Sequence, residues 1–195
     1  MSDTLTSIRK QLRLQRKRVS RNEHKKAEQQ VLNLLRHFAP FQSAQSVGLY
    51  LHAFGEIHTQ KLIQLCFKQK KQVYLPMICN MNRQLVWVKI NAQQYFTQRF
   101  SHHPLGMKEP MASRGVHVST LDLLIMPLLA CDQHGTRIGM GGGFYDRTLA
   151  SAPHRPFRLG LAHNFQYVVQ PLTRQKWDQP LDGLLTPKNL YIFKR

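Results

Sequence analysis

The chain has 195 residues, of which 42% are hydrophobic, and its formal net charge is +18. This length is typical of one globular domain, which we expect to cover residues 1–195. No segment approaches the roughly 18 uninterrupted apolar residues of a membrane-spanning helix. We therefore expect no membrane partner.

Cysteine usage and the first residues indicate the compartment. Cys66, Cys79 and Cys131 are scattered, odd in number and without metal-ligand spacing. The first twenty residues lack the apolar core of a secretory signal. These features predict a cytoplasmic protein with reduced thiols.

The positive charge would attract polyanions, which include nucleic acid, anionic membrane surfaces and small ligands rich in phosphate or carboxylate. Residues 1–36 hold ten Lys or Arg against three acids, as a nucleic-acid-binding arm would. The solvated face of a surface helix explains the same pattern. The charge alone does not choose among these partners.

Two amphipathic helices are predicted at the start of the chain. Leu5, Ile8 and Leu12 recur at helical spacing. Ser20 and Glu23 form a capping-box pattern ahead of a second periodic apolar stretch that runs to about residue 38.

A strand, a helix and a second strand follow. Residues 46–51 have strand character, residues 59–70 have helical character with Thr59 as the expected cap, and residues 72–76 form a strand that Pro76 closes. The order predicts one βαβ unit.

The rest of the chain predicts a mostly parallel sheet. Residues 84–90 alternate as a strand does, and residues 101–115 lack periodicity, which predicts a loop that covers a site. Near-continuous apolar runs at 121–129, 157–162 and 181–187 are typical of strands buried on both faces. We predict a three-layer α/β fold, with helices on both faces of the central sheet.

Residues 137–147 read "RIGMGGGFYDR" and lie between a predicted strand and a short helix at 145–151. Glycines at such a place allow close backbone approach and expose N–H groups to an anion such as phosphate. Phe144 stands where the dinucleotide pattern needs glycine, and the Gly-Lys-Ser/Thr ending of a Walker A loop is missing. A tight turn with close strand–helix contact explains the glycines equally well.

Charged residues beside the loop favour phosphate. Asp146 could hold a Mg²⁺ that bridges phosphate oxygens, and Arg137 and Arg147 could neutralise the remaining charge. Because Mg²⁺ usually takes one or two protein carboxylates, Asp178 is a candidate second ligand. A cap or turn role for Asp178 is equally plausible from its sequence context.

The order of these pieces resembles the 5-formyltetrahydrofolate cyclo-ligase family, also called methenyltetrahydrofolate synthetase. The resemblance rests on "MPLLACDQHGTRIGMGGGFYDRTL" and continues in "GLYLHAFGEIHTQKLI", "VYLP", "GMKEP" and "KWDQPLDGLLTP". It covers nearly the whole chain.

The resemblance implies a ligase of one-carbon metabolism. Members convert 5-formyltetrahydrofolate to 5,10-methenyltetrahydrofolate with ATP and Mg²⁺, releasing ADP and phosphate, and a phosphorylated imidate is the expected intermediate. These two small molecules are then the expected substrates, nucleic acid is not expected as a partner, and we expect a monomer.

Site residues follow from the matched motifs. The resemblance implies an ATP site made of Arg9, Lys10, Arg13, Arg137, Gly139, Met140, Gly141, Gly142, Gly143, Phe144, Tyr145, Asp146 and Arg147. It implies a folate site made of Leu51, Glu56, Gly142, Gly143, Phe144 and Tyr145. Glu56, Tyr145 and Arg147 are the expected catalytic residues, with Glu56 orienting the pterin N–H groups, and Asp146 and Asp178 are the expected metal ligands.

Three positions depart from the family pattern. Gly142 stands where lysine is frequent, and Leu5 stands where a basic residue is frequent one helical turn before Arg9. Lys10 or Arg13 could compensate for Leu5. Cys131 stands where an aromatic residue is common.

Other residues admit sharper and plainer interpretations. Cys131 and His134 could form a nucleophilic pair, but nothing else in the chain completes an acyl-transfer site. His102 and His103 lack a third metal ligand at suitable spacing and are expected in a loop. Trp87 could stack on the pterin, although its strand pattern favours the core.

Two rival functions belong to other classes. The basic helices could bind nucleic acid, yet residues 1–36 contain no aromatic residue of the kind that stacks on bases. Alternatively the protein binds a nucleotide on the same fold without folate chemistry, and such a protein would have no reason to keep Glu56 and Tyr145.

Overall fold

The computed structural model of the protein describes residues 2–79 and 81–194. The helices are α1 (Ser2–Lys17), α2 (Arg21–Arg36), α3 (Ala39–Ser43), α4 (Gln60–Lys68), α5 (Ala92–Phe96) and α6 (Phe144–Ala150), with 3-10 turns at Val118–Thr120 and Asn164–Gln166. The strands are β1 (Ser46–Gly48), β2 (Gln72–Cys79), β3 (Gln84–Ile90), β4 (Phe100–His102), β5 (Lys108–Pro110), β6 (Leu123–Pro127), β7 (Ala130–Asp132), β8 (Arg137–Ile138), β9 (Phe157–Leu161), β10 (Tyr167–Val168), β11 (Gly183–Leu185) and β12 (Leu190–Ile192).

A seven-stranded sheet forms the centre, in the order β12-β11-β9-β6-β1-β2-β3. The five inner strands run parallel, and β3 and β12 pair antiparallel at the two edges. The mostly parallel α/β fold predicted from the apolar runs is confirmed.

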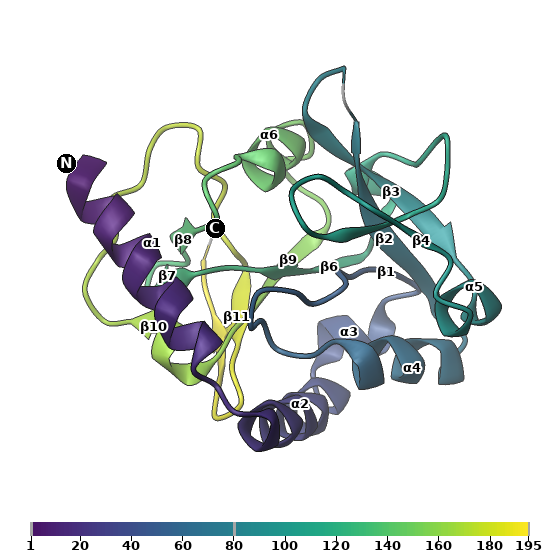
Figure 1. The fold of residues 1–195 in the computed structure, drawn as a ribbon, viewed down its shortest axis with the longest axis horizontal. Coiled ribbons are helices and arrows are strands. Elements are labelled where there is room, and N and C mark those ends of the chain that lie inside the picture. Colours follow the sequence, from purple (N-terminus) through teal and green to yellow (C-terminus); the bar gives the residue numbers. More distant parts are fainter. Residues whose placement is uncertain (1, 80, 195) are drawn as a thin grey trace.

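Both faces of this sheet are buried, because residues along β6 alternate between two cores. Leu123 and Ile125 pack into the cluster that contains α2, α3 and α4 side chains. Leu124 and Met126 pack into the second cluster, which includes Leu149 of α6. Figure 1 shows α2, α3 and α4 below the sheet and α6 above it, which is the three-layer arrangement expected.

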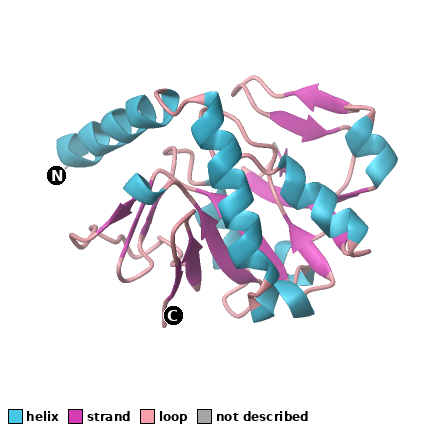
Figure 2. Ribbon diagram, turned by 90° about the horizontal axis from the view of Figure 1, so that it is seen from below, coloured by secondary structure: helices cyan, strands magenta, loops and turns pink. Residues whose placement is uncertain are grey.

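Helix α1 packs on a smaller sheet of order β10-β7-β8. Leu5, Ile8 and Leu12 form its apolar stripe and pack with Leu129 and Ile138. Figure 2 shows this helix, marked N, extending away from the helices that cover the central sheet. Its arginine face is thereby free to meet the loop that follows β8.

Local predictions near the start of the chain are confirmed. Ser20 and Glu23 make both hydrogen bonds of the capping box that starts α2. β1, α4 and β2 form the expected βαβ unit, with β1 and β2 parallel. Thr59 is at the N-cap of α4, but its hydroxyl donates to Tyr50 O at 2.7 Å instead of capping the helix.

The prediction that Pro76 closes a strand is wrong. β2 continues to Cys79, and Pro76 lies opposite Trp87 of β3. Trp87 exchanges both of its backbone hydrogen bonds with Val116, at 2.9 and 2.8 Å. Pro76 therefore occupies a pair without hydrogen bonds, where its missing N–H costs nothing.

The prediction of a loop over residues 101–115 is also wrong in part. β4 and β5 pair antiparallel there, with Ser101 opposite Glu109. Glu109 is 8% exposed and its Oε1 accepts a hydrogen bond from Ile78 N at 3.0 Å, which ties the small sheet to β2. Short strands of this kind lack apolar alternation, so periodicity does not reveal them.

Among the residues that the structure describes, no helix combines the length and apolar character needed to cross a bilayer.

Candidate active site

Three arginines of α1 face the glycine loop, which we define as residues 139–143. Arg9 Nε donates to Gly139 O at 3.2 Å, and Arg13 Nη2 donates to Met140 O at 2.9 Å. Arg16 follows one turn later and reaches the side chain of Met140. Spacings of four and three residues place all three arginines on one helix face. This face of α1 contacts the start of the glycine loop.

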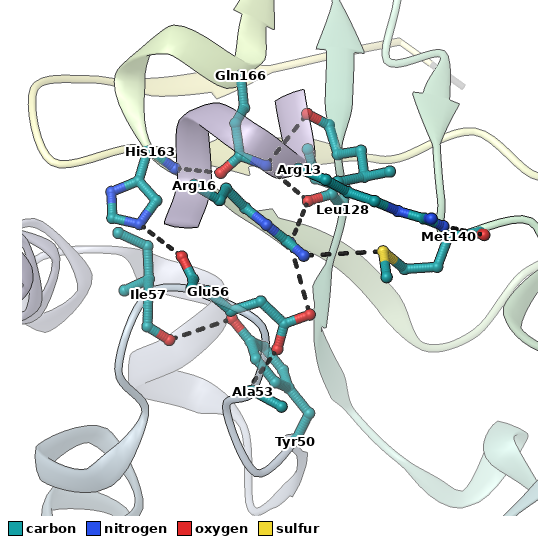
Figure 3. A network of polar contacts seen from close by, with 12 residues as sticks. Arg13, Arg16, Tyr50, Ala53, Glu56, Ile57, Leu128, Met140, His163 and Gln166 are labelled. Atoms are coloured by element: carbon teal, nitrogen blue, oxygen red, sulfur yellow. Dashed lines mark hydrogen bonds and ion pairs between the residues drawn. The ribbon is translucent and has the colours of Figure 1, made fainter. Parts of the chain in front are cut away.

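Arg16 lies at the centre of the site and is 1% exposed. Its Nη1 donates to Leu128 O at 3.3 Å and lies 3.6 Å from Glu56 Oε1. Its Nη2 lies 3.7 Å from Met140 Sδ. Figure 3 shows the guanidinium between the Glu56 carboxylate and the Met140 thioether, so one side chain contacts both predicted half-sites.

Glu56 is held in a turn after β1 and is 9% exposed. Its Oε2 accepts a hydrogen bond from Ala53 N at 3.0 Å, and Gly55 supplies the positive φ of 77° that the turn needs. Burial raises the pKa of Glu56 to about 7, although the Ala53 N–H and Arg16 oppose this shift. The carboxyl can therefore change its charge near neutral pH.

The glycine loop bends through two left-handed residues. Gly141 and Gly143 have φ values of 102° and 66°, a region that favours glycine. A Cβ on Gly142 would lie 2.7 Å from the Phe144 ring, and a Cβ on Gly143 would lie 2.8 Å from Arg147 Nη1. Side chains of α6 thus lie directly against the loop backbone.

Asp146 is in the first turn of α6 and its side chain is 22% exposed. Arg137 Nη2 donates to its Oδ1 at 2.7 Å, and Gln179 N donates to the same oxygen at 3.1 Å. Within residues 2–79 and 81–194, both hydrogen bonds fall on Oδ1, which leaves Oδ2 available to a ligand. The Arg137 guanidinium also lies 5.7 Å from the ring centroid of Tyr145.

Arg147 is exposed and holds the loop in place. Its Nε donates to Arg83 O at 3.1 Å, its Nη2 donates to Gly142 O at 2.6 Å, and its guanidinium lies 5.3 Å from the Phe144 ring centroid. It joins the glycine loop to the turn between β2 and β3.

Asp178 makes a turn on its own segment. Its Oδ2 accepts a hydrogen bond from Gln175 N at 2.8 Å, which is the turn role left open above. The next residue, Gln179, bonds to Asp146, so both acids belong to adjoining segments. No cluster of three or more His, Cys, Asp or Glu suited to a metal occurs in the described residues. Mg²⁺ bound through phosphates needs only one or two carboxylates. The unbonded Oδ2 of Asp146 suits such an ion, and metal binding by Asp178 stays a prediction.

A cavity of about 600 Å³ opens beside the loop. Its lining includes Gly141, Gly142 and Phe144 on one side and His103 and Leu105 on the other. Neither Glu56 nor Arg16 is part of this lining.

The predicted ligand contacts of Lys10 and Leu51 stay predictions, and the structure gives the positions of these residues and of Leu5. Lys10 is exposed and makes none of the contacts with the glycine loop that Arg9 and Arg13 make. Leu51 is half-buried and packs on the main core, and Leu5 packs on the small sheet. Leu5 therefore serves α1 packing at the position where a basic residue is frequent in the family pattern.

Sequence reasoning missed Arg16. The signal was present, because Arg9, Arg13 and Arg16 repeat on a face of α1 that flanks its apolar stripe, and Arg16 follows Leu12 at i, i+4 spacing. Basic residues are usual on surface helices, so the pattern alone did not mark one of them as buried.

Four histidines stack beside the Glu56 turn, and these were also missed. The rings of His24 and His58 stack at 4.5 Å, those of His52 and His58 at 4.3 Å, and His163 meets His24 edge-on at 5.2 Å. Burial lowers the pKa of His52 and His163 to about 4 each. His52 and His163 are therefore neutral at pH 7.

The plainer interpretations of other residues hold, with one exception. Burial raises the pKa of the Cys131 thiol to about 12, which opposes a nucleophilic role. Trp87 is fully buried in the core, as expected. His103 is in a turn, but His102 is in β4 rather than a loop.

Comparisons with known proteins agree with this arrangement. A sequence model described as the 5-formyltetrahydrofolate cyclo-ligase family matches residues 2–187. The 5-formyltetrahydrofolate cyclo-ligase of Escherichia coli K12 is 33% identical over 184 residues, which are 92% of this chain and 98% of that protein. That of Haemophilus influenzae is 33% identical over 188 residues, at the same coverage. The 5,10-methenyltetrahydrofolate synthetase structure of Aquifex aeolicus superposes with a TM-score of 0.81 at 27% identity, covering 98% and 93% of the two chains. The protein belongs to the 5-formyltetrahydrofolate cyclo-ligase family.

Proposed function

We propose that the protein converts 5-formyltetrahydrofolate to 5,10-methenyltetrahydrofolate, with ATP hydrolysed to ADP and phosphate and Mg²⁺ bound to the nucleotide. The observation that carries this proposal is the convergence of Glu56 and the glycine loop on Arg16, at 3.6 and 3.7 Å. Residues more than 80 positions apart in the sequence thereby come within reach of one substrate pair.

The first step activates the formyl group. A formamide oxygen is a weak nucleophile, so it must be held in line with the γ-phosphorus of ATP. The oxygen–phosphorus bond forms as the bond to the bridging oxygen breaks, and ADP leaves. Positioning and charge neutralisation supply most of the catalysis in such transfers. We assign the phosphates to the glycine loop backbone, with Arg9, Arg13, Arg137 and Arg147 around it.

The second step closes the ring. The N10 nitrogen attacks the imidate carbon, loses its proton, and the carbon–oxygen bond to phosphate breaks. A carboxylate at Glu56 can accept hydrogen bonds from the pterin N–H groups, because Oε1 has no hydrogen-bond donor within 3.5 Å among the described residues. Its pKa of about 7 also suits a proton acceptor near neutral pH. Tyr145, half-buried between Glu56 and Arg137, is assigned to the folate side.

Metal binding falls to Asp146, with Asp178 on the adjoining segment. When bound, Mg²⁺ neutralises charge on the transferred phosphoryl group. Oδ2 of Asp146 is the available oxygen, and Arg137 keeps the carboxylate in place through Oδ1. Asp178 must release Gln175 N if it binds the same ion.

We further propose that the chain acts in the cytoplasm as one domain and as a monomer. A nucleic-acid-binding role draws support only from the +18 charge. Nothing about the buried Glu56 serves such a role. Sedimentation at low and physiological salt, with and without RNA, tests whether the protein is a monomer and whether it binds nucleic acid.

The direct test mixes purified protein with 5-formyltetrahydrofolate, ATP and Mg²⁺ and follows the near-ultraviolet absorbance of the methenyl product. Omitting any one component must abolish the signal. ATP binding with no product under any condition would support the rival of a nucleotide-binding protein without folate chemistry.

A further inference from the structure

We propose that Arg16 is a positioning residue of the cyclisation site, which fixes the Glu56 carboxylate and the glycine loop relative to each other. This inference rests on the proposed function. It deepens that function because it assigns the alignment of the two half-sites to one buried side chain outside the family motifs quoted above.

Burial of this guanidinium is costly for the fold. Arg16 is 1% exposed, burial lowers its pKa, and its Nε has no hydrogen-bond partner among the described residues. A buried charge with incomplete partners destabilises a fold relative to an apolar side chain of similar volume. Leu128 O is the one backbone acceptor of its Nη1 in the part of the chain described, at 3.3 Å. Stability therefore does not explain why an arginine is at this position.

The distance to Glu56 suits a positioning role. Nη1 lies 3.6 Å from Oε1, which is an ion-pair distance and too long for a hydrogen bond. The positive charge therefore stabilises the ionised carboxylate, while the lone pairs of Oε1 stay available to a substrate N–H. Oε2 is held separately by Ala53 N at 3.0 Å. Figure 3 shows Arg16 approaching the carboxylate from the side of α1.

The opposite side of the guanidinium reaches the glycine loop. Nη2 lies 3.7 Å from Met140 Sδ, and the backbone oxygen of the same residue is held by Arg13 at 2.9 Å. Met140 is thus fixed by two successive arginines of α1. A displacement of Arg16 moves both the loop and the environment of Glu56.

Few other charges face Glu56. Tyr50, which follows β1, and Tyr145 of α6 both face it, and burial raises the pKa of each phenol. Both are neutral at pH 7. His52 and His163, on the adjoining loops, have pKa values lowered by burial to about 4 and are neutral as well. Arg16 is therefore the charge that governs the state of this carboxyl.

The first test is the pH dependence of kcat/KM for 5-formyltetrahydrofolate. Loss of the charge in Arg16→Gln leaves burial opposed only by the Ala53 N–H, so the pKa of Glu56 rises above about 7. The acidic limb is the fall of kcat/KM at low pH, where Glu56 becomes protonated. We expect this limb to move to higher pH by about one unit, so that kcat/KM is about tenfold lower than in wild type at pH 6 and close to the wild-type value at pH 9. Arg16→Lys keeps a charge and should return the limb toward its wild-type position, with a raised KM because the forked geometry is lost.

A double-mutant cycle separates this role from a structural one. If Arg16 acts on Glu56, then Arg16→Gln in a Glu56→Gln background should lower kcat/KM for 5-formyltetrahydrofolate less than about threefold at saturating ATP, where the contact with the glycine loop does not limit the rate. A merely structural arginine would cost the same factor in both backgrounds. Met140→Leu removes only the thioether, and should raise the KM for ATP a few-fold without moving the acidic limb.

Arg18→Gln is the matched control, because it removes an exposed arginine two residues further along the chain. It should leave both the limb and KM unchanged. Thermal unfolding of every variant identifies those that fail to fold, and if Arg16→Gln is among them Arg16→Lys carries the test. An acidic limb that stays in place in Arg16→Gln, or a Lys variant with unchanged limb and KM, overturns this inference alone. A wild-type protein that forms no methenyl product overturns the proposed function itself.

Discussion

The two acids of the site are held in opposite ways. Glu56 is 9% exposed and its cation lies 3.6 Å away, so burial dominates and its pKa rises to about 7. The Asp146 side chain is 22% exposed and is bonded directly to Arg137 at 2.7 Å. Each acid keeps one oxygen unbonded within the described residues, and the difference lies in the cation, which stays at ion-pair distance from Glu56 but donates a hydrogen bond to Asp146.

The same difference extends to the segments around the two acids. The Glu56 turn is packed among Arg16, buried tyrosine and stacked histidine rings. The glycine loop is exposed at Gly141 and Gly142 and is held from outside by arginine side chains. The proposed folate side is therefore formed by packing, and the proposed phosphate side by hydrogen bonds that a ligand can exchange.

Asp146→Asn breaks the phosphate side and should have the largest effect. The carboxamide keeps the size of the side chain and loses its charge, so turnover should fall at least about a hundredfold. Thermal unfolding should change little because the Asn Oδ1 can still accept the hydrogen bonds from Arg137 and Gln179. A Mg²⁺ titration of initial rates checks this, and normal activity at limiting Mg²⁺ would remove Asp146 from the metal site.

Glu56→Gln breaks the folate side. Gln retains one acceptor and loses the charge, so kcat/KM for 5-formyltetrahydrofolate should fall about a hundredfold while ATP affinity changes little. The acidic limb of the pH profile should disappear with it. Calorimetry gives the affinity for ATP, and steady-state kinetics give kcat/KM for 5-formyltetrahydrofolate. Equal decreases in the two would point to a structural role.

Stability against pH sharpens the comparison. The folded pKa of Glu56 lies above the ordinary value of 4.5, so its contribution to stability falls as pH rises from about 4.5 to 7. Gln mimics the protonated acid, so Glu56→Gln should raise the free energy of unfolding by up to about 3 kcal/mol at pH 8 and little at pH 4.

His163 should show the reverse dependence. Its folded pKa of about 4 lies below the ordinary 6.5, so its contribution is present above pH 6.5 and is lost as pH falls through about 4. His163→Gln should flatten this acid loss, and urea unfolding from pH 4 to 8 measures both variants. Parallel curves for wild type and both variants would refute the assigned pKa shifts.

Gly143→Ala should have the smallest effect. The residue has φ of 66° and its Cβ would lie 2.8 Å from Arg147 Nη1, the flexible end of a side chain. The strain costs about 1 kcal/mol, and ATP should bind a few-fold more weakly because the loop shifts. Gly115, remote from the site, offers a control through Gly115→Ala: this should destabilise the fold without changing the KM for ATP. Equal KM values for ATP in the two variants would show that the glycine loop does not bind ATP.

Features set by local sequence were predictable. The apolar runs gave the buried strands, the Ser20–Glu23 pattern gave the start of α2, and the glycine run with Asp146 marked the loop. Each depends on residues close in the chain, where spacing determines geometry.

Features set by distant contacts were not predictable. Pro76 remains inside β2 because Val116, 40 positions away, takes the hydrogen bonds of Trp87. Arg16 is buried because residues at 56, 128 and 140 enclose it, and no local pattern identifies these partners. Hydrophobic periodicity carries no information about such partners.

The central claim is that the glycine loop presents a nucleotide phosphate to the formyl oxygen of the folate held at Glu56. The most direct measurement uses 5-formyltetrahydrofolate with ¹⁸O in the formyl group and follows the label through one turnover. Because the carbon–oxygen bond breaks in the second step, the account predicts that the released phosphate carries the ¹⁸O atom. Unlabelled phosphate beside labelled water, with methenyl product formed, would contradict it.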